Sequence, residues 1–276
     1  KPLKVLKAIG WEPEVKEAFL AKGGRELPVV SYPGFDPQPS IDAVREARRH
    51  IVPVTTIDLW LERQAQAIEL SARMLAGVGT PAFFECGRQL YGEPKAPLRY
   101  VDLTPLALAQ DVIATIDQLA RIDIKTAPPA YHTAQSVAAD LEKAVRVHFG
   151  DQAPAIVLVD RLSANALATS KQIKVRSGAR FTDRDFVQLL HHEAYIHVAT
   201  SLNGQAQTDL PILGAGHPGT TRTQEGLAVF AELISGSIEL DRLRRLADRV
   251  LTIQMALDGA DFLEVYRFFL DRTGDP

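Results

Sequence analysis

The stretch DRDFVQLLHHEAYIHVATSL, residues 183–202, governs the interpretation of the whole chain, because it joins a helical pattern of apolar residues to three histidines and a glutamate. An apolar residue recurs at every fourth position from Phe186 to Val198, which is typical of a buried helical face. Thr182, just before the stretch, is a suitable N-cap. The sequence therefore predicts a buried helix that carries polar side chains.

The spacing of two histidines is the unusual feature of this helix. His192 and His197 lie five positions apart. In the HExxH helix of zinc proteases the histidines are four apart and point to one side, whereas at about 100° per residue a spacing of five leaves the rings about 140° apart. A π-type turn, with i to i+5 hydrogen bonds, returns such residues to nearly the same face. A shared metal ion therefore predicts a widened turn between Glu193 and His197.

Two other interpretations of these residues stay open. A histidine beside a buried apolar stripe is often a hydrogen-bonded core residue, and this applies to His191 as well as to His192 and His197. Alternatively, Glu193 and His197, which are four apart, bind a metal on a regular helix without His192. That arrangement loosely resembles the carboxylate and histidine helices of di-iron bundles, although the sequence contains no second copy of the pair.

A third ligand is needed if the histidines hold a catalytic zinc, because such sites usually have three protein ligands. Glu225, in TQEGLAVFAE (223–232), lies at the start of the next expected helix. An acidic residue in a first turn also has a simpler role, in which it stabilises the helix dipole. Glu232, seven residues later, shares the face of Glu225 and is expected either to support a ligand or to be solvated.

The rest of the chain is expected to be mostly helical, with a small sheet just before the histidine helix. The runs AIVLVD (155–160) and KQIKVR (171–176) are short and rich in β-branched residues, as strands are. Elsewhere apolar residues recur with helical spacing between proline and glycine breaks. Helices are expected at residues 11–21, 41–51, 58–77, 104–120, 134–150, 222–234, 238–257 and 261–272.

Composition argues against several classes of function. The 31 basic and 34 acidic residues give a net charge of −3, so no overall field attracts nucleic acid or anionic lipid. Cys86 is the only cysteine, which excludes an internal disulfide. No apolar run approaches the ~20 residues of a membrane span, and a cytoplasmic location is the default expectation. One arginine cluster is interleaved with aspartates and is better explained as a solvated helix face than as a nucleic-acid site: Arg242, Arg244, Arg245 and Arg249.

The motifs HEAYIH (192–197) and TQEGLA (223–228) resemble the QEGLA-motif family of bacteria, a domain of unknown function named for modulating flavohaemoglobin expression. That family is similar to the eukaryotic microtubule-associated tyrosine carboxypeptidases, which share an H-E-x-x-x-H helix and a downstream E-G-L-A. The resemblance covers most of the chain, and its most specific parts are residues 162–186, 191–204 and 214–232. The AYI insert differs from the glycine-containing one of the eukaryotic enzymes, and the family would extend beyond both ends of this chain.

This resemblance implies a role for each polar residue of the two motifs. His192 and His197 would bind zinc, and Glu225 would be the third ligand. Glu193 would be the general base, which takes a proton from the attacking water and passes it to the leaving amine. The substrate implied is the C-terminus of a peptide or protein.

Five further residues are candidates for contacts with a substrate. The second expected strand is a candidate to receive an extended peptide by edge addition, with Lys174 and Arg176 beside it, although solvated charges explain both residues more simply. Arg222 is the candidate to bind a terminal carboxylate, because a planar guanidinium suits that group. His217 and Tyr195 are candidates to stabilise an oxyanion.

Together these features predict one α+β domain over residues 1–276, mostly helical and zincin-like, with a small sheet before the metal-binding helix. Its helical part would cover about 1–127, and the sheet and metal-site helices about 128–276. The predicted function is a zinc-dependent metallocarboxypeptidase, with neither nucleic acid nor a membrane as partner. The alternative is a regulatory protein that binds a metal or a peptide without turnover.

Overall fold

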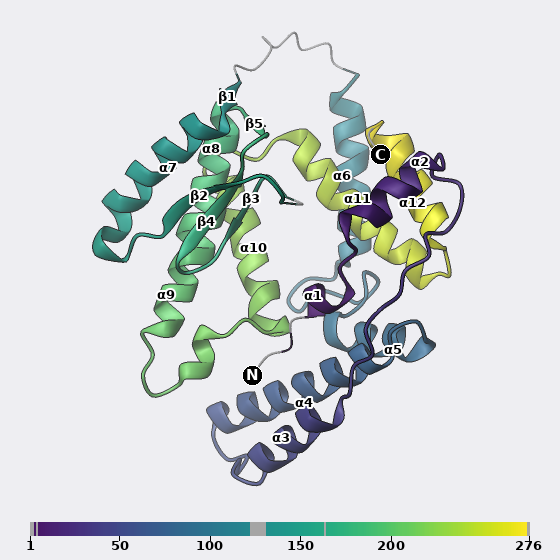
Figure 1. Ribbon diagram of the computed structural model, residues 1–276, viewed down its shortest axis with the longest axis vertical. Coiled ribbons are helices and arrows are strands. Elements are labelled where there is room, and N and C mark those ends of the chain that lie inside the picture. The colour runs from purple at the N-terminus through teal and green to yellow at the C-terminus, as the bar shows by residue number, and fades with distance from the viewer. Residues whose placement is uncertain (1–2, 4, 122–130, 163, 275–276) are drawn as a thin grey trace. The chain divides into compact units, whose positions relative to one another are not determined.

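The computed structural model describes residues 3, 5–121, 131–162 and 164–274 (Figure 1). The chain divides into two compact units: unit 1 combines Lys1–Arg121 with Asp241–Pro276, and unit 2 is the uninterrupted stretch Ile122–Leu240. The last two expected helices therefore group with the N-terminal part of the chain. The expected internal boundary near residue 127 lies outside the described residues, and the single domain stays a prediction.

The described residues of unit 1 form helices joined by loops, and they contain no strand. Its longest helix begins with a capping box, in which the Thr55 hydroxyl accepts a hydrogen bond from the backbone N–H of Asp58 and the Asp58 carboxylate accepts one from the backbone N–H of Thr55. The helices are α1 (Val5–Ile9), α2 (Pro13–Ala21), α3 (Gln38–Arg48), α4 (Thr56–Ala76), α5 (Pro81–Tyr91), α6 (Pro105–Leu119), α11 (Leu240–Leu257), whose first residue ends unit 2, and α12 (Phe262–Thr273).

Every expected helix is present, although some begin elsewhere than predicted. Helix α3 starts at Gln38, three residues early, because a proline is tolerated in the first turn, where its missing N–H has no partner to lose. Helix α5 is not among the expected helices, although Pro81 in its first turn and Gly92 after its last residue are typical helix boundaries. None of the described helices is long and apolar enough to cross a bilayer.

Unit 2 contains a three-stranded sheet with the order β2 (Ala155–Val159), β4 (Gln172–Arg176), β3 (Ala166–Ala168). Strand β2 runs parallel to β4, and β3 runs antiparallel to it. The two expected strands are thereby confirmed as β2 and β4. A second, two-stranded ladder joins β1 (His132–Thr133) to β5 (Arg180–Phe181). The structure is mostly helical with small sheets, which confirms the α+β class.

The core of unit 2 lies between the sheet, helix α7 (Ala134–Phe149) and the helix that carries the histidines. Each of these elements contributes side chains with no exposed surface. They are Leu141 and Val145 from α7, Ile173 and Val175 from β4, and Ala194 and Val198 from the histidine helix.

Strand β4 has a neighbour on both sides, which makes the expected edge addition to it wrong. Residues of β2 pair with β4 along all five of its positions, and β3 pairs along three. The backbone groups of β4 are therefore engaged within the sheet. Lys174 and Arg176 alternate with the buried Ile173 and Val175, so they lie on the opposite face of a central strand rather than at an edge.

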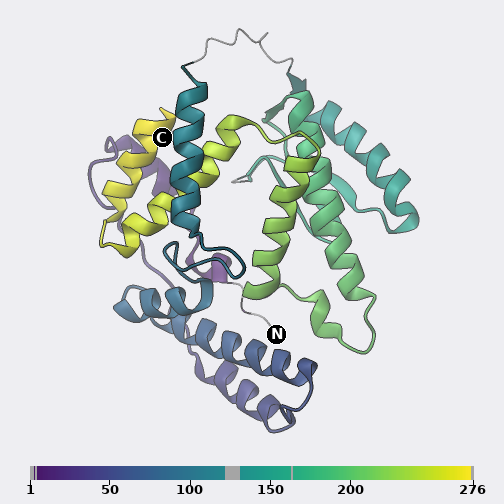
Figure 2. The ribbon, with the colours of Figure 1, turned by 180° about the vertical axis from the view of Figure 1, so that it is seen from behind.

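The histidine helix consists of three consecutive helical segments, and a second helix, described below as α10, lies beside it (Figure 2). Helix α8 (Asp183–Leu189) passes into the π-helix η2 (Leu190–Val198) and then into α9 (Ala199–Gln205). Thr182 and Asp185 form a capping box at the start of α8, as the sequence predicts for Thr182. Short 3-10 turns occur at Gly150–Gln152 and Pro211–Gly214, and α10 (Pro218–Ile234) then packs along η2.

Candidate metal centre

The widened turn that the histidine spacing predicts is present. Residues Leu190–Val198 form a π-helix, so positions five apart return to nearly the same face. The rings of His192 and His197 have centroids 4.9 Å apart and meet at 72°. On a regular helix these rings would point about 140° apart around the axis. The π-helix is therefore the feature that brings the two imidazoles together.

Glu225 completes a cluster with the two histidines. Its Oε2 lies 3.8 Å from Nε2 of His192, and its Oε1 lies 3.5 Å from Nε2 of His197. One ligand atom from each of the three residues lies within 4.8 Å of the others. Ligand atoms that share a tetrahedral zinc at ~2.0 Å are about 3.3 Å apart, so this donor set fits the ion after small side-chain movements.

The second ring nitrogen of each histidine is held by a residue of α10. Nδ1 of His192 lies 2.6 Å from Oε1 of Glu232, and Nδ1 of His197 lies 3.2 Å from Oε1 of Gln224. A carboxylate oxygen can only accept, so Nδ1 of His192 is the donor to Glu232, and with the same arrangement at Gln224 the Nε2 atoms of both rings face Glu225. The sequence analysis predicts no role for Gln224. The one feature that could have indicated a role is its position directly before Glu225.

Glu193 lies in the same π-helix, and burial raises the pKa of its carboxyl group. His192 and His197 oppose this rise, as does a hydrogen bond from the backbone N–H of Ala168, at the end of β3. A carboxylate with a raised pKa exchanges a proton closer to neutral pH than an exposed glutamate does.

The cluster bears on the alternatives that the sequence left open. Among the described residues, the group with metal-ligand geometry contains His192, His197 and Glu225 and does not contain Glu193. This favours the pair five apart over the pair of Glu193 and His197. The assignment of ligands nevertheless stays a prediction, because hydrogen-bonded core histidines would show similar contacts to Glu232 and Gln224.

Tyr195 packs against the last residues of helix α7. Its ring centroid lies 4.5 Å from that of His148 and 5.2 Å from that of His191. Phe149 is a further ring neighbour, at 6.5 Å. The ring contacts of Tyr195 are thus with His148, Phe149 and His191, and its expected oxyanion role stays a prediction.

His217 is the N-cap of α10, which gives its polar ring a structural role. Its Nδ1 accepts a hydrogen bond from the backbone N–H of Thr220, and Thr220 Oγ1 accepts one from the backbone N–H of His217. Burial lowers the pKa of His217, which keeps the imidazole neutral and able to accept. Eight residues at about 1.5 Å each place its Cα about 12 Å along α10 from that of Glu225, and its expected oxyanion role stays a prediction.

Replacing His217 with Ala is expected to lower the free energy of unfolding by about 0.5–2 kcal/mol, because the cap of α10 is lost. His217→Asn should recover most of this, since asparagine is a good N-cap. Denaturant unfolding of both variants measures the effect. A stable His217→Asn variant with impaired turnover would instead place the ring at the reaction centre.

Arg222 is exposed and lies one turn before Glu225 on α10, so the two side chains share a side of the helix. Among the described residues Arg222 makes no ion pair, which leaves its guanidinium available. Arg176, by contrast, donates from Nη2 to Oδ1 of Asn165 at 2.7 Å on the sheet. Of the basic residues proposed for substrate contacts, Arg222 is the one on the same helix as Glu225.

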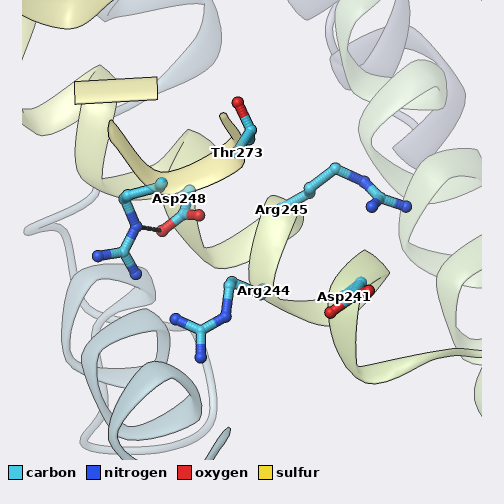
Figure 3. A pocket seen from close by; sticks show the side chains of 6 residues that line it. Asp241, Arg244, Arg245, Asp248 and Thr273 are labelled. Atoms are coloured by element: carbon cyan, nitrogen blue, oxygen red, sulfur yellow. Dashed lines mark ion pairs between the residues drawn. The ribbon is translucent and has the colours of Figure 1, made fainter. Parts of the chain in front are cut away.

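The arginine cluster of α11 lies in unit 1 and is partly neutralised. Nη2 of Arg244 lies 2.5 Å from Oδ1 of Asp117, and Nε of Arg272 lies 2.6 Å from Oδ1 of Asp248. The Arg244 guanidinium holds the pKa of Asp117 below its usual range. Arg245 and Arg249 are exposed, as a solvated face requires, whereas Asp248 is buried and paired with Arg272 of α12. The absence of a nucleic-acid partner stays a prediction. The side chains surround a cavity of about 420 Å³ (Figure 3), lined by Asp241, Arg244, Arg245, Asp248, Arg272 and Thr273.

The likeness to known proteins covers the chain from helix α2 to its end. A family model described as "Microtubule-associated tyrosine carboxypeptidase" matches residues 17–276. Neither the curated proteins nor the solved structures gave a match. The matched region includes both motifs and all three residues of the cluster, which confirms the resemblance seen in HEAYIH and TQEGLA. Because the match extends over far more than half of its length, the chain belongs to the family of microtubule-associated tyrosine carboxypeptidases.

Proposed function

We propose that this protein is a zinc-dependent metallocarboxypeptidase whose catalytic centre lies in unit 2, on a zincin-like arrangement of helices. The main support for the proposal is a cluster of three ligand atoms, one each from His192, His197 and Glu225, that lie within 4.8 Å of one another. The π-helix brings the two histidines of this cluster together. The family adds support, since its name describes an enzyme that removes a C-terminal residue.

His192, His197 and Glu225 would hold the ion. Two imidazole nitrogens and one carboxylate are a donor set typical of catalytic zinc, which keeps a further position open. When bound there, zinc would supply Lewis-acid activation of water and of the peptide carbonyl. The chain's own part would be to hold both rings in the position that binding requires, and the contacts of both Nδ1 atoms with α10 support this.

Glu193 would act as the general base. Its carboxylate lies between the two histidines in sequence and is not needed as a ligand. It would accept a proton from the attacking water and deliver that proton to the leaving nitrogen. The last residue would then leave as an amino acid with a neutral amino group. The raised pKa of Glu193 suits both transfers, because the proton must be taken and released in one turnover.

Arg222 would give the enzyme its preference for chain ends. A free C-terminal carboxylate can form two parallel hydrogen bonds with a guanidinium, and internal peptide groups cannot. Arg222 is exposed and one turn from Glu225, so it is well placed to bind a terminal carboxylate near the scissile bond.

The test is to incubate the zinc-loaded protein with short peptides of varied last residue, tyrosine included, and to weigh the products by mass spectrometry. We expect loss of the last residue, no reaction after chelation, and recovery when zinc is restored. The matched control is the same peptide with an amidated C-terminus, which should be cut poorly. Arg222→Gln should remove most of the difference between the two peptides. A protein that takes up zinc and leaves every peptide intact would contradict the enzyme and favour a binding role.

A further inference from the structure

The buried face of α10 contains a charged residue where packing alone would favour an apolar one. Ala228 is fully buried, Ala231 is almost so, and Glu232 has no exposed surface. The two alanines allow η2 to approach α10 closely. A buried carboxylate costs several kcal/mol unless hydrogen bonds or an opposite charge compensate it, so its contacts indicate its purpose.

The contact that the Glu232 carboxylate makes with the candidate site is short and specific. Its Oε1 lies 2.6 Å from Nδ1 of His192, the ring whose Nε2 faces Glu225. A carboxylate that accepts from Nδ1–H fixes the imidazole in one tautomer and one orientation, and it makes Nε2 a stronger electron donor. The contact of Gln224 with Nδ1 of His197 is longer, at 3.2 Å. Because its amide oxygen is neutral, it makes a weaker hydrogen bond than a carboxylate does.

We propose that Glu232 is a positioning residue of the metal centre, which prepares His192 as a ligand through the hydrogen bond to Nδ1. This inference rests on the zinc site of the proposed function, although it does not require hydrolysis. Helix α10 then supplies one ligand, Glu225, and the supports of the other two. The rigid packing of α10 on η2 keeps all three donor atoms in place.

The test compares Glu232→Gln with wild type in zinc affinity, measured by competition with a coloured chelator. Glutamine keeps the size of the side chain and can still accept a weaker hydrogen bond, so the fold should survive. We expect zinc affinity to fall about 10–100-fold, the usual effect of removing such a support. Cobalt-loaded protein provides a second readout, since the visible spectrum should shift when His192 is less well held. The ring N–H resonance of His192 in the metal-free protein should move to higher field.

Asp248→Asn is the matched control, because Asp248 is another buried carboxylate, 1% exposed and paired with Arg272 in unit 1. Both variants should lose thermal stability, and only Glu232→Gln should lose zinc affinity. Equal zinc affinity in Glu232→Gln and wild type would overturn the proposal, as would a wild type that binds no zinc. A wild type that binds zinc without cutting peptides, with Glu232→Gln weakened, would support the proposal and contradict the peptidase alone.

Discussion

Replacing Glu193 with Gln is expected to lower kcat by about 10²–10⁴-fold while the protein keeps its zinc. A carboxamide has the shape of the carboxylate and cannot take a proton from water, so the proton transfer fails without a change in packing. Zinc should stay, because the cluster of ligand atoms consists of His192, His197 and Glu225. Steady-state kinetics on a peptide cut by the wild type, together with elemental analysis, measure both quantities.

The matched control for this variant is Glu142→Gln, at an exposed position of α7 in the same unit. It should behave as wild type in both measurements. Two outcomes would contradict the assignment of Glu193 as base. Unchanged turnover would mean that another group moves the proton. Loss of zinc with turnover would make Glu193 a ligand and revive the pairing of Glu193 with His197.

Replacing His197 or Glu225 with Ala is expected to reduce the zinc content from about one ion per chain to nearly none. Each change leaves two protein ligands. The loss of zinc affinity should therefore exceed the loss of about 10–100-fold that follows removal of a supporting residue. His192→Ala should have the same result. Elemental analysis of the purified variants beside wild type, after removal of excess metal, is the measurement.

His191→Ala is the matched control, since this histidine is next to a ligand in sequence and contacts the ring of Tyr195 instead. It should keep its zinc. Retention of zinc in Glu225→Ala would disprove the third ligand and leave the glutamate as a first-turn residue of α10. Absence of zinc from the wild type would leave all three histidines as hydrogen-bonded core residues.

The sequence predicts the π-helix well because metal coordination is a strict geometric demand. A pair five residues apart cannot meet on a regular helix, so a shared ligand implies the wide turn that Leu190–Val198 adopt. Thr182 as a cap and β4 as a strand are confirmed for a similar reason, since cap residues and alternating patterns act locally.

The failures concern relations between distant segments. The alternation of KQIKVR predicts a strand but gives no information on whether neighbours flank it, and β2 and β3 in fact occupy both sides of β4. The support of His197 by Gln224 depends on how α10 packs on η2, which no local pattern encodes. His217 attracted a chemical interpretation because its capping role depends on where α10 begins, four residues before the expected start.

The order of the two units along the chain has a consequence at the level of the gene. Unit 2 is one uninterrupted segment, Ile122–Leu240, and unit 1 is made from the segments on either side of it. A stop codon after residue 240 would spare every residue of the candidate centre and would remove nearly all of α11 and α12 from unit 1. In genetic terms unit 2 is an insertion within unit 1, so a nonsense mutation just after codon 240 first damages the unit that carries no candidate ligand.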